Sequence, residues 1–278
     1  MQLKGEQLGA HLARELKPVY LVYGDEPLLV IEAGDAIRAA ARKQGFDERE
    51  VLTAISGFDW NQLAMAAGNL SLFGGRKLID LRIPTGKPGR EGSAAIQDYC
   101  QRCTPDTLLL VTLPALDWKD EKAAWMTALA EAGAALKLNA PPLAELPAWI
   151  AGRLQRQGQG ADREALAFIA ERVEGNLLAA QQEIRKLGLL YPEKQLTLAE
   201  VREAVLDVAR FDLDSLREAL LAGDAARLTR TLDGLRQEGE AAPLVLWAMT
   251  EEVRALAQIR SGMDEGQPAD MLMRDARV

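Results

Sequence analysis

The first 140 residues alternate between short strand-like runs and helix-like runs, and this alternation limits the fold more than any other feature. Strands are expected at five apolar or β-branched runs, residues 19–24, 50–55, 77–83, 107–113 and 134–139. Helical periodicity fills the intervals, at residues 26–42, 59–67, 93–103 and 119–131, and Asp25 is the expected N-cap of the first helix. Parallel strands need crossover connections, which are usually helices, so the pattern predicts an α/β domain on a parallel sheet.

Beyond Ala140 the pattern is helical, and the sequence shows no further strand-like run. Expected helices cover residues 143–157, 162–173, 176–190 and 197–206, and the last opens with a capping box, Thr197 to Glu200. A third block holds helices at 212–221, 225–237 and 243–261, and then an amphipathic stretch without a terminating cap. We therefore expect three domains, residues 1–140, 141–210 and 211–278, the last cut short at its C-terminal end.

Composition excludes several classes of protein. Two cysteines in 278 residues cannot build a disulfide framework, and the charged N-terminus lacks the apolar centre of a secretory signal, so a cytoplasmic location is expected. No apolar run approaches the ~18 residues of a membrane span. The net charge of −8 disfavours a stand-alone nucleic-acid binder, because attraction to phosphate needs a positive field. A single histidine, His11, leaves little scope for histidine chemistry.

The turn after the first strand is where an α/β nucleotide-binding protein carries its phosphate-binding loop. That loop needs Gly-x-x-x-x-Gly-Lys-Ser/Thr, whose backbone amides and lysine hold the phosphates. Here the turn has no lysine, and Asp25 and Glu26 follow Gly24 where phosphate would bind. We therefore expect no nucleotide and no other cofactor.

Cys100 and Cys103 have the C-x-x-C spacing of redox and zinc sites. The pair is expected to end a helix rather than open one, and no further cysteine or histidine completes a metal site. We expect a structural role, with no catalytic residue and no metal.

The segment LSLFGGRK, residues 70–77, carries Leu70, Ser71, Leu72 and Phe73 between a helix end and a strand start. These apolar side chains either plug the edge of the sheet or form an exposed finger at the tip of a glycine-rich loop. Positive side chains follow closely, at Arg76, Lys77, Arg82, Lys87 and Arg90. An apolar tip with a basic rim suits a partner that has an apolar pocket within an acidic surface.

At this loop the chain resembles the delta-subunit family of the bacterial DNA polymerase III clamp loader. The resemblance extends over the whole chain in order, through PVYLVYGDEPLLVIEAGDAIR at 18–38, LSLFGGRK at 70–77, AAWMTALA at 123–130, LPAWIAGRLQRQG at 146–158 and EGNLLAAQQEIRKLGLLYPEKQLTLAEVREAV at 174–205.

The resemblance implies an AAA+-like parallel-sheet domain, a small helical domain and a helical collar domain. It implies that Leu70, Ser71, Leu72 and Phe73 bind the sliding clamp (beta), with Arg76 and Lys77 as a supporting basic rim. The chain would open the ring for loading onto primed DNA during replication. It would have no ATPase site of its own; the polymerase activity would belong to the holoenzyme.

Further partners implied by the resemblance are the gamma/tau and delta prime subunits, bound through the collar domain. Primed DNA would be contacted only within the assembled loader, and no membrane is involved. Two alternatives remain, an active AAA+ ATPase with an unusual phosphate loop and a DNA-binding helical adaptor.

Overall fold

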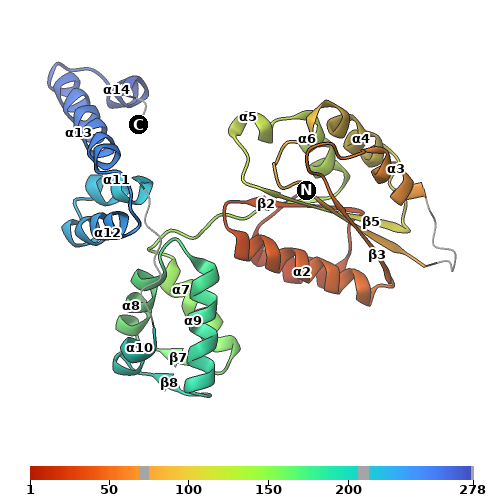
Figure 1. Cartoon of the computed structure of the whole chain (residues 1–278), viewed down its shortest axis with the longest axis horizontal. Helices are drawn as coiled ribbons and strands as arrows, with labels where there is room; N and C mark the ends of the chain where they lie inside the picture. Colours follow the sequence, from red (N-terminus) through yellow and green to blue (C-terminus); the bar gives the residue numbers. More distant parts are fainter. Residues whose placement is uncertain (69–74, 206–212, 277–278) are drawn as a thin grey trace. The chain divides into compact units, whose positions relative to one another are not determined.

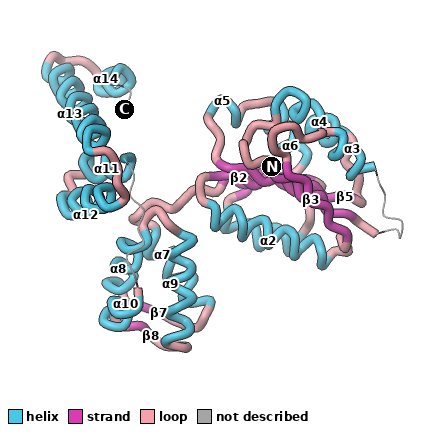
Figure 2. Tube along the Cα trace, viewed as in Figure 1, coloured by secondary structure: helices cyan, strands magenta, loops and turns pink. Residues whose placement is uncertain are grey.

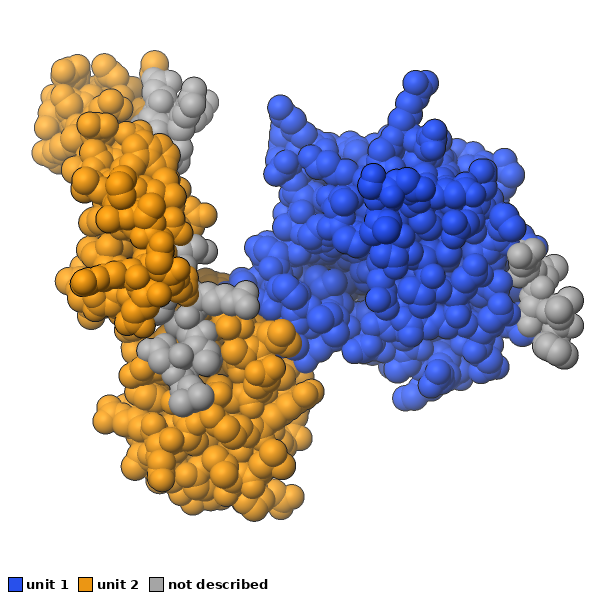
Figure 3. Space-filling model, in the orientation of Figure 1, with its two compact units in different colours: residues 1–141 blue, residues 142–278 orange. Residues whose placement is uncertain are grey.

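The structure, a computed structural model, describes residues 1–68, 75–205 and 213–276. The chain divides into two compact units, residues 1–141 and 142–278 (Figure 3). The second unit contains both helical blocks expected from the sequence, so the boundary near residue 210 stays a prediction. No helix in the described ranges is both long and apolar enough to cross a membrane.

The first unit is a six-stranded sheet covered by helices on both faces (Figures 1 and 2). All neighbouring strands are parallel, and their spatial order is β1-β6-β2-β5-β4-β3. The strands are β1 Gln2–Leu3, β2 Val19–Gly24, β3 Glu48–Thr53, β4 Lys77–Arg82, β5 Thr107–Pro114 and β6 Ala134–Lys137. This confirms the expected α/β class with a parallel sheet, and adds the short strand β1 to the five that the sequence predicted.

The helices of this unit form two layers. Helices α1 and α2 pack on the face that presents Tyr20, Val22 and Leu108, whereas α3, α4 and α6 pack on the face that presents Leu21 and Val111. The helices are α1 Leu8–Arg14, α2 Pro27–Lys43, α3 Asn61–Gly68, α4 Gly89–Gln101, α5 Trp118–Glu121 and α6 Ala124–Ala132, and a 3-10 turn covers Gly5–Gln7. Alternate residues of β2 and β5 therefore enter opposite cores, as in a sheet buried on both faces.

Residues 119–131 form two helices rather than the single helix expected. Ala123 has an extended backbone, with φ −64° and ψ 147°, which ends α5 and starts α6 in a new direction. The break lets Trp125 and Leu129 of α6 enter the core, while Trp118 of α5 stays exposed beneath the Lys122 ammonium.

The second unit is helical, with one two-stranded pairing that the sequence did not predict. Strands β7 Gly160–Ala161 and β8 Gln195–Leu196 pair in parallel, but two residues each are too few for a periodic signal. The helices are α7 Leu146–Arg156, α8 Arg163–Val173, α9 Leu177–Leu190, α10 Leu198–Ala204, α11 Leu213–Leu221, α12 Ala225–Gln237, α13 Ala242–Asp264 and α14 Ala269–Ala276.

The capping box expected at the start of α10 is present. The Thr197 hydroxyl accepts from the Glu200 amide at 3.4 Å, and the Glu200 carboxylate accepts from the Thr197 amide at 2.9 Å. Hydrogen bonds from Lys194 and Thr197 lower the pKa of Glu200 to about 2. The carboxylate therefore stays charged where α10 needs its cap.

Candidate functional site

The turn between β2 and α2 is closed by its own side chains. The Glu26 carboxylate is buried and accepts a hydrogen bond from the Leu28 amide at 3.0 Å, so Glu26, and not Asp25, is the N-cap of α2. Asp25 instead accepts from the Ala140 amide at 2.9 Å. Both carboxylates thus satisfy backbone amides of the protein itself.

Gly24 brings this turn against the end of β6. A Cβ atom at Gly24 would lie 1.8 Å from the Leu138 carbonyl oxygen, so only glycine fits. A nucleotide phosphate in this fold would need free amides at the start of α2 and a cation beside them. The Glu26 carboxyl group occupies that position, and the residues of the turn do not fit a phosphate group.

Four of the predicted site residues, Leu70, Ser71, Leu72 and Phe73, lie outside the described residues. Their flanks are described: α3 ends at Gly68, and β4 begins at Lys77. The segment therefore joins the sheet at the amino-terminal end of β4. The β2–α2 turn lies at the opposite end of the sheet, where the parallel strands finish.

Arg76, the first expected rim residue, ties this junction to its neighbours. Its guanidinium donates to the Pro105 carbonyl at 2.8 and 3.3 Å and to the Gln44 carbonyl at 3.0 Å. It also stacks 4.2 Å from the centre of the Phe46 ring. Arg76 remains cationic, because carbonyl acceptors do not neutralise its charge.

Lys77, the second expected rim residue, points into the sheet edge and not to solvent. The residue is 5% exposed, and its ammonium lies 3.1 Å from Glu48 and 3.2 Å from Glu50 on β3. Burial alone would lower the pKa of Lys77, but hydrogen bonds to the two carboxylates outweigh it and raise the pKa. Lys77 is therefore protonated, and its charge is balanced by the carboxylates of Glu48 and Glu50. The expectation of a free surface cation at this position is corrected.

The later cations of the predicted rim lie elsewhere. Lys87 and Arg90 follow the carboxyl end of β4, and Lys87 pairs with Asp120 at 3.2 Å. A six-residue strand spans about 20 Å, so these side chains follow the carboxyl end of β4, whereas Gly68 and Arg76 lie near its amino end. Adjacency in sequence did not give adjacency in space.

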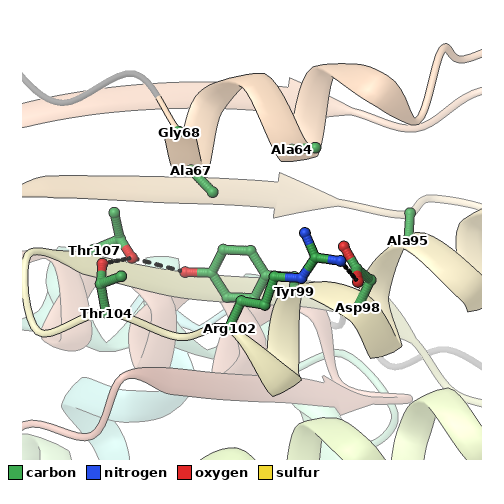
Figure 4. Close-up of a pocket in the computed structure, with 9 residues that line it drawn as sticks. All are labelled: Ala64, Ala67, Gly68, Ala95, Asp98, Tyr99, Arg102, Thr104 and Thr107. Carbon is green, nitrogen blue, oxygen red and sulfur yellow. Dashed lines mark hydrogen bonds and ion pairs between the residues drawn. The ribbon is translucent and has the colours of Figure 1, made fainter.

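A hollow of about 280 Å³ lies between α3 and α4, next to Gly68 (Figure 4). Small side chains line it from both helices, Ala64 and Ala67 from α3 and Ala95 from α4. Tyr99 donates to the Thr107 hydroxyl at 3.3 Å, and burial raises the pKa of Tyr99. The phenol is therefore neutral at ordinary pH, and the two charged groups of the lining, Asp98 and Arg102, form an ion pair with each other at 2.6 Å.

The remaining candidate residues have structural roles. The Cys103 thiol lies 3.5 Å from the Cys100 carbonyl, both cysteines are free, and burial raises the pKa of Cys100 to about 12. His11 is buried, with Nε2 at 3.0 Å from the Tyr20 hydroxyl. Within the described ranges, no group of three or more His, Cys, Asp or Glu side chains could hold a metal ion.

Comparison with known proteins identifies relatives over nearly the whole chain. Residues 20–138 match the family described as DNA polymerase III, delta subunit. The chain is 34% identical over 264 residues to the DNA polymerase III subunit delta of Escherichia coli K12, covering 94% of this chain and 76% of the relative. The corresponding protein of Haemophilus influenzae is 31% identical over 261 residues, covering 91% and 74%.

A solved structure supports the fold. The DNA clamp loader delta protein of Bacillus subtilis superposes with a TM-score of 0.56 at 19% identity, covering 99% of this chain and 84% of that one. At this identity the match supports the architecture alone. It agrees with the AAA+-like fold expected from the sequence.

Proposed function

Because the chain belongs to the family of DNA polymerase III delta subunits, we propose that it is the clamp-opening subunit of a replicative clamp loader. In this role it binds the sliding clamp and opens the ring for loading onto primed DNA. The observation that carries the proposal is the match at 34% identity over 94% of the chain. The protein would act in the cytoplasm, and polymerase chemistry would belong to the complex.

Clamp binding is assigned to Leu70, Ser71, Leu72 and Phe73. Support comes from the described flanks: the segment follows Gly68 at the end of α3, and Arg76 on its other side is held by three hydrogen bonds. An apolar tip on a fixed base is suited to entering a preformed apolar pocket. Arg76 would contribute positive charge at this base.

We also propose that the protein works without binding nucleotide. The Glu26 carboxylate caps α2, and the turn has no lysine, which removes the two features that hold phosphate. ATP in the millimolar range should leave the melting temperature unchanged, because a specific ligand of the native state must raise it. A saturable rise would favour the alternative of an active AAA+ ATPase.

The other loader subunits, gamma/tau and delta prime, would bind through the C-terminal helices. Large apolar side chains are exposed along α13, at Leu246, Trp247, Val253 and Leu256. Such side chains on one helix are typical of a surface that another protein covers. Primed DNA would meet this chain only within the assembled loader.

The deciding experiment is a clamp-binding measurement on Leu72→Ala/Phe73→Ala. Burying a leucine and a phenylalanine in a pocket is worth roughly 1.5–3 kcal/mol each, so the double variant should bind on the order of several hundredfold more weakly. Its melting temperature should not change. The control is Ile55→Ala/Leu189→Ala, which removes two exposed apolar side chains elsewhere and should leave binding intact.

Two results would contradict the assignment. Undiminished clamp binding by the double variant would show that Leu72 and Phe73 do not bind the clamp. A large fall in the melting temperature, corresponding to a loss of several kcal/mol in the free energy of unfolding, would mean that these side chains pack against the edge of the sheet as core residues do. A salt-dependent shift of DNA by the isolated chain would instead favour a DNA-binding adaptor.

A further inference from the structure

The face of the sheet that carries α2 is only partly covered. Helix α2 packs on β2 and β5, and the outer strands β4 and β3 extend beyond it. In the parallel register Val51 lies beside Asp80 and Thr53 beside Arg82, so these side chains share the face. Val51 is 46% exposed, which marks a surface without a covering helix.

A hollow of about 470 Å³ lies between α2 and these strands, and most of its charged lining is basic. Its cations are Arg38, Arg42, Lys43 and Arg49, and Asp35 and Asp47 are its carboxylates. We call these four cations and the neighbouring Arg82 the cationic face. The chain as a whole carries a net charge of −8, so this face runs against the overall balance.

Asp80 forms the buried floor of the cationic face. One of its oxygens accepts from Arg38 at 3.1 Å and from Arg49 at 2.5 Å, and the other lies 3.5 Å from the Arg82 guanidinium. A single carboxylate therefore serves three guanidinium groups. It fixes their positions, and with Asp35, which also pairs with Arg38 at 2.8 Å, two carboxylates face three guanidinium groups.

Arg42 and Lys43 complete the excess of charge. Both are exposed in the last turn of α2, and neither makes an ion pair within the part of the chain that the structure describes. Cations commonly stabilise the carboxyl end of a helix. Here they also adjoin the arginines on Asp80, so the charged side chains that line the hollow are net positive.

The cationic face continues to the base of the finger. The Gln44 carbonyl, directly after Lys43, accepts from Arg76, and the Phe46 ring that lines the hollow lies under the same guanidinium. Arg76 precedes β4 where the finger segment rejoins the sheet. The two surfaces are thus joined through described residues.

We propose that the cationic face is a second contact with the sliding clamp, and that it binds an acidic patch beside the pocket that takes the finger. This inference rests on the proposed function. A protein surface fits better than nucleic acid, because Ile31 and Val51 add exposed apolar area that a phosphate backbone would not bury. Charges at the rim of an interface mainly accelerate encounter.

The test is the association rate of the full chain with the clamp at several salt concentrations. Arg42→Glu/Lys43→Glu should slow association roughly tenfold at low salt, and the deficit should shrink as salt screens the charges. The dissociation rate should change little. Arg42→Gln/Lys43→Gln should give a smaller deficit of the same sign, without placing negative charge at a helix end.

The matched control is Arg90→Glu/Lys119→Glu, which makes the same change in net charge at the opposite edge. Both side chains are exposed and form no ion pair with any residue the structure describes. Equal association rates and salt slopes for the two reversals would overturn the inference. So would a loss of DNA binding in Arg42→Glu/Lys43→Glu with clamp association unchanged.

The outcomes separate this inference from the proposed function. If the unmodified chain does not bind the clamp, the proposed function fails, and the inference fails with it. If Leu72→Ala/Phe73→Ala abolishes binding while the Arg42 and Lys43 variants match their control, the function stands and only the second contact is excluded.

Discussion

Replacing Asp80 with asparagine removes the negative charge beneath the cationic face while keeping the size of the side chain. The Asp80 side chain is fully buried, whereas those of Arg38 and Arg49 are 20% and 42% exposed. In the Asp80→Asn protein, the guanidinium groups would surround a neutral amide that cannot balance their charge. The arginines could turn partly to water, which limits the loss.

The size of the effect follows from two hydrogen bonds. A hydrogen bond to a charged group is worth about 1.5–3 kcal/mol, and the asparagine oxygen can still accept a bond from a guanidinium group, though a weaker one than a carboxylate accepts. Breaking a fully buried ion pair costs about 3–5 kcal/mol, but partly exposed arginines recover some hydration. We expect Asp80→Asn to lower the local stability of β4 and β3 by about 2–3 kcal/mol.

Hydrogen exchange of the β4 and β3 amides is the appropriate assay, because a chain of two compact units need not unfold in one step. Asp35→Asn is the control: Asp35 contacts the same Arg38 at 2.8 Å but is exposed, so its loss should cost less than about 1 kcal/mol. A loss below about 0.5 kcal/mol for Asp80→Asn would refute the reasoning. The same variant should associate with the clamp faster at low salt, because the face becomes more positive.

Three further results are expected. Burial lowers the pKa of His11, so protons bind preferentially to the unfolded chain; the melting temperature should fall from pH 7.5 to 5.5, and a His11→Gln protein with the same slope would contradict this. A Cβ atom at Gly92 would lie 2.3 Å from the Trp60 ring, so Gly92→Ala should lower stability by about 1–3 kcal/mol, and a higher melting temperature would show that the ring simply moves. Burial raises the pKa of Cys100 to about 12, so its alkylation by iodoacetamide at pH 8 should be slow until the chain unfolds; a rate equal to that of a free thiol would contradict this.

The parallel sheet could be predicted because its strands are buried on both faces. The run at β5 has no polar side chain between Leu108 and Val111, which is the pattern of a strand between two helical layers. The strand β2 matched its predicted bounds, since Gly24 ends it where the chain must approach Leu138. Long apolar runs that end at a glycine can therefore be recognised as strands from the sequence alone.

The misses have local physical causes. The break at Ala123 comes from the need to turn Trp125 toward the core, which helical periodicity does not encode. Strand β1 has two residues and pairs with β6, far away in the sequence. Glu26 caps α2 in place of the predicted Asp25, because the Asp25 carboxylate accepts a hydrogen bond from the Ala140 amide instead. Each depends on a partner distant in the chain.

The candidate site was less predictable than the fold for the same reason. A basic rim was expected from residues that follow the finger, yet Lys77 is paired with Glu48 and Glu50. The cations that surround the finger base come from α2 and β3 instead. Arg49 reaches Asp80 because β3 pairs in parallel with β4, and Arg38 reaches it because α2 packs on the same face of the sheet.

The turn at Gly24 has an evolutionary consequence. A lysine introduced there by a single substitution would not create a phosphate site, because Glu26 would still fill the start of α2 and the Leu138 carbonyl would still press on Gly24. Regaining such a site requires the cap, the turn and the end of β6 to change together, and intermediates would lose a cap worth about 1 kcal/mol without gaining a ligand. A descendant of this chain could therefore bind nucleotide only after several substitutions that depend on one another, none of which would create a binding site by itself.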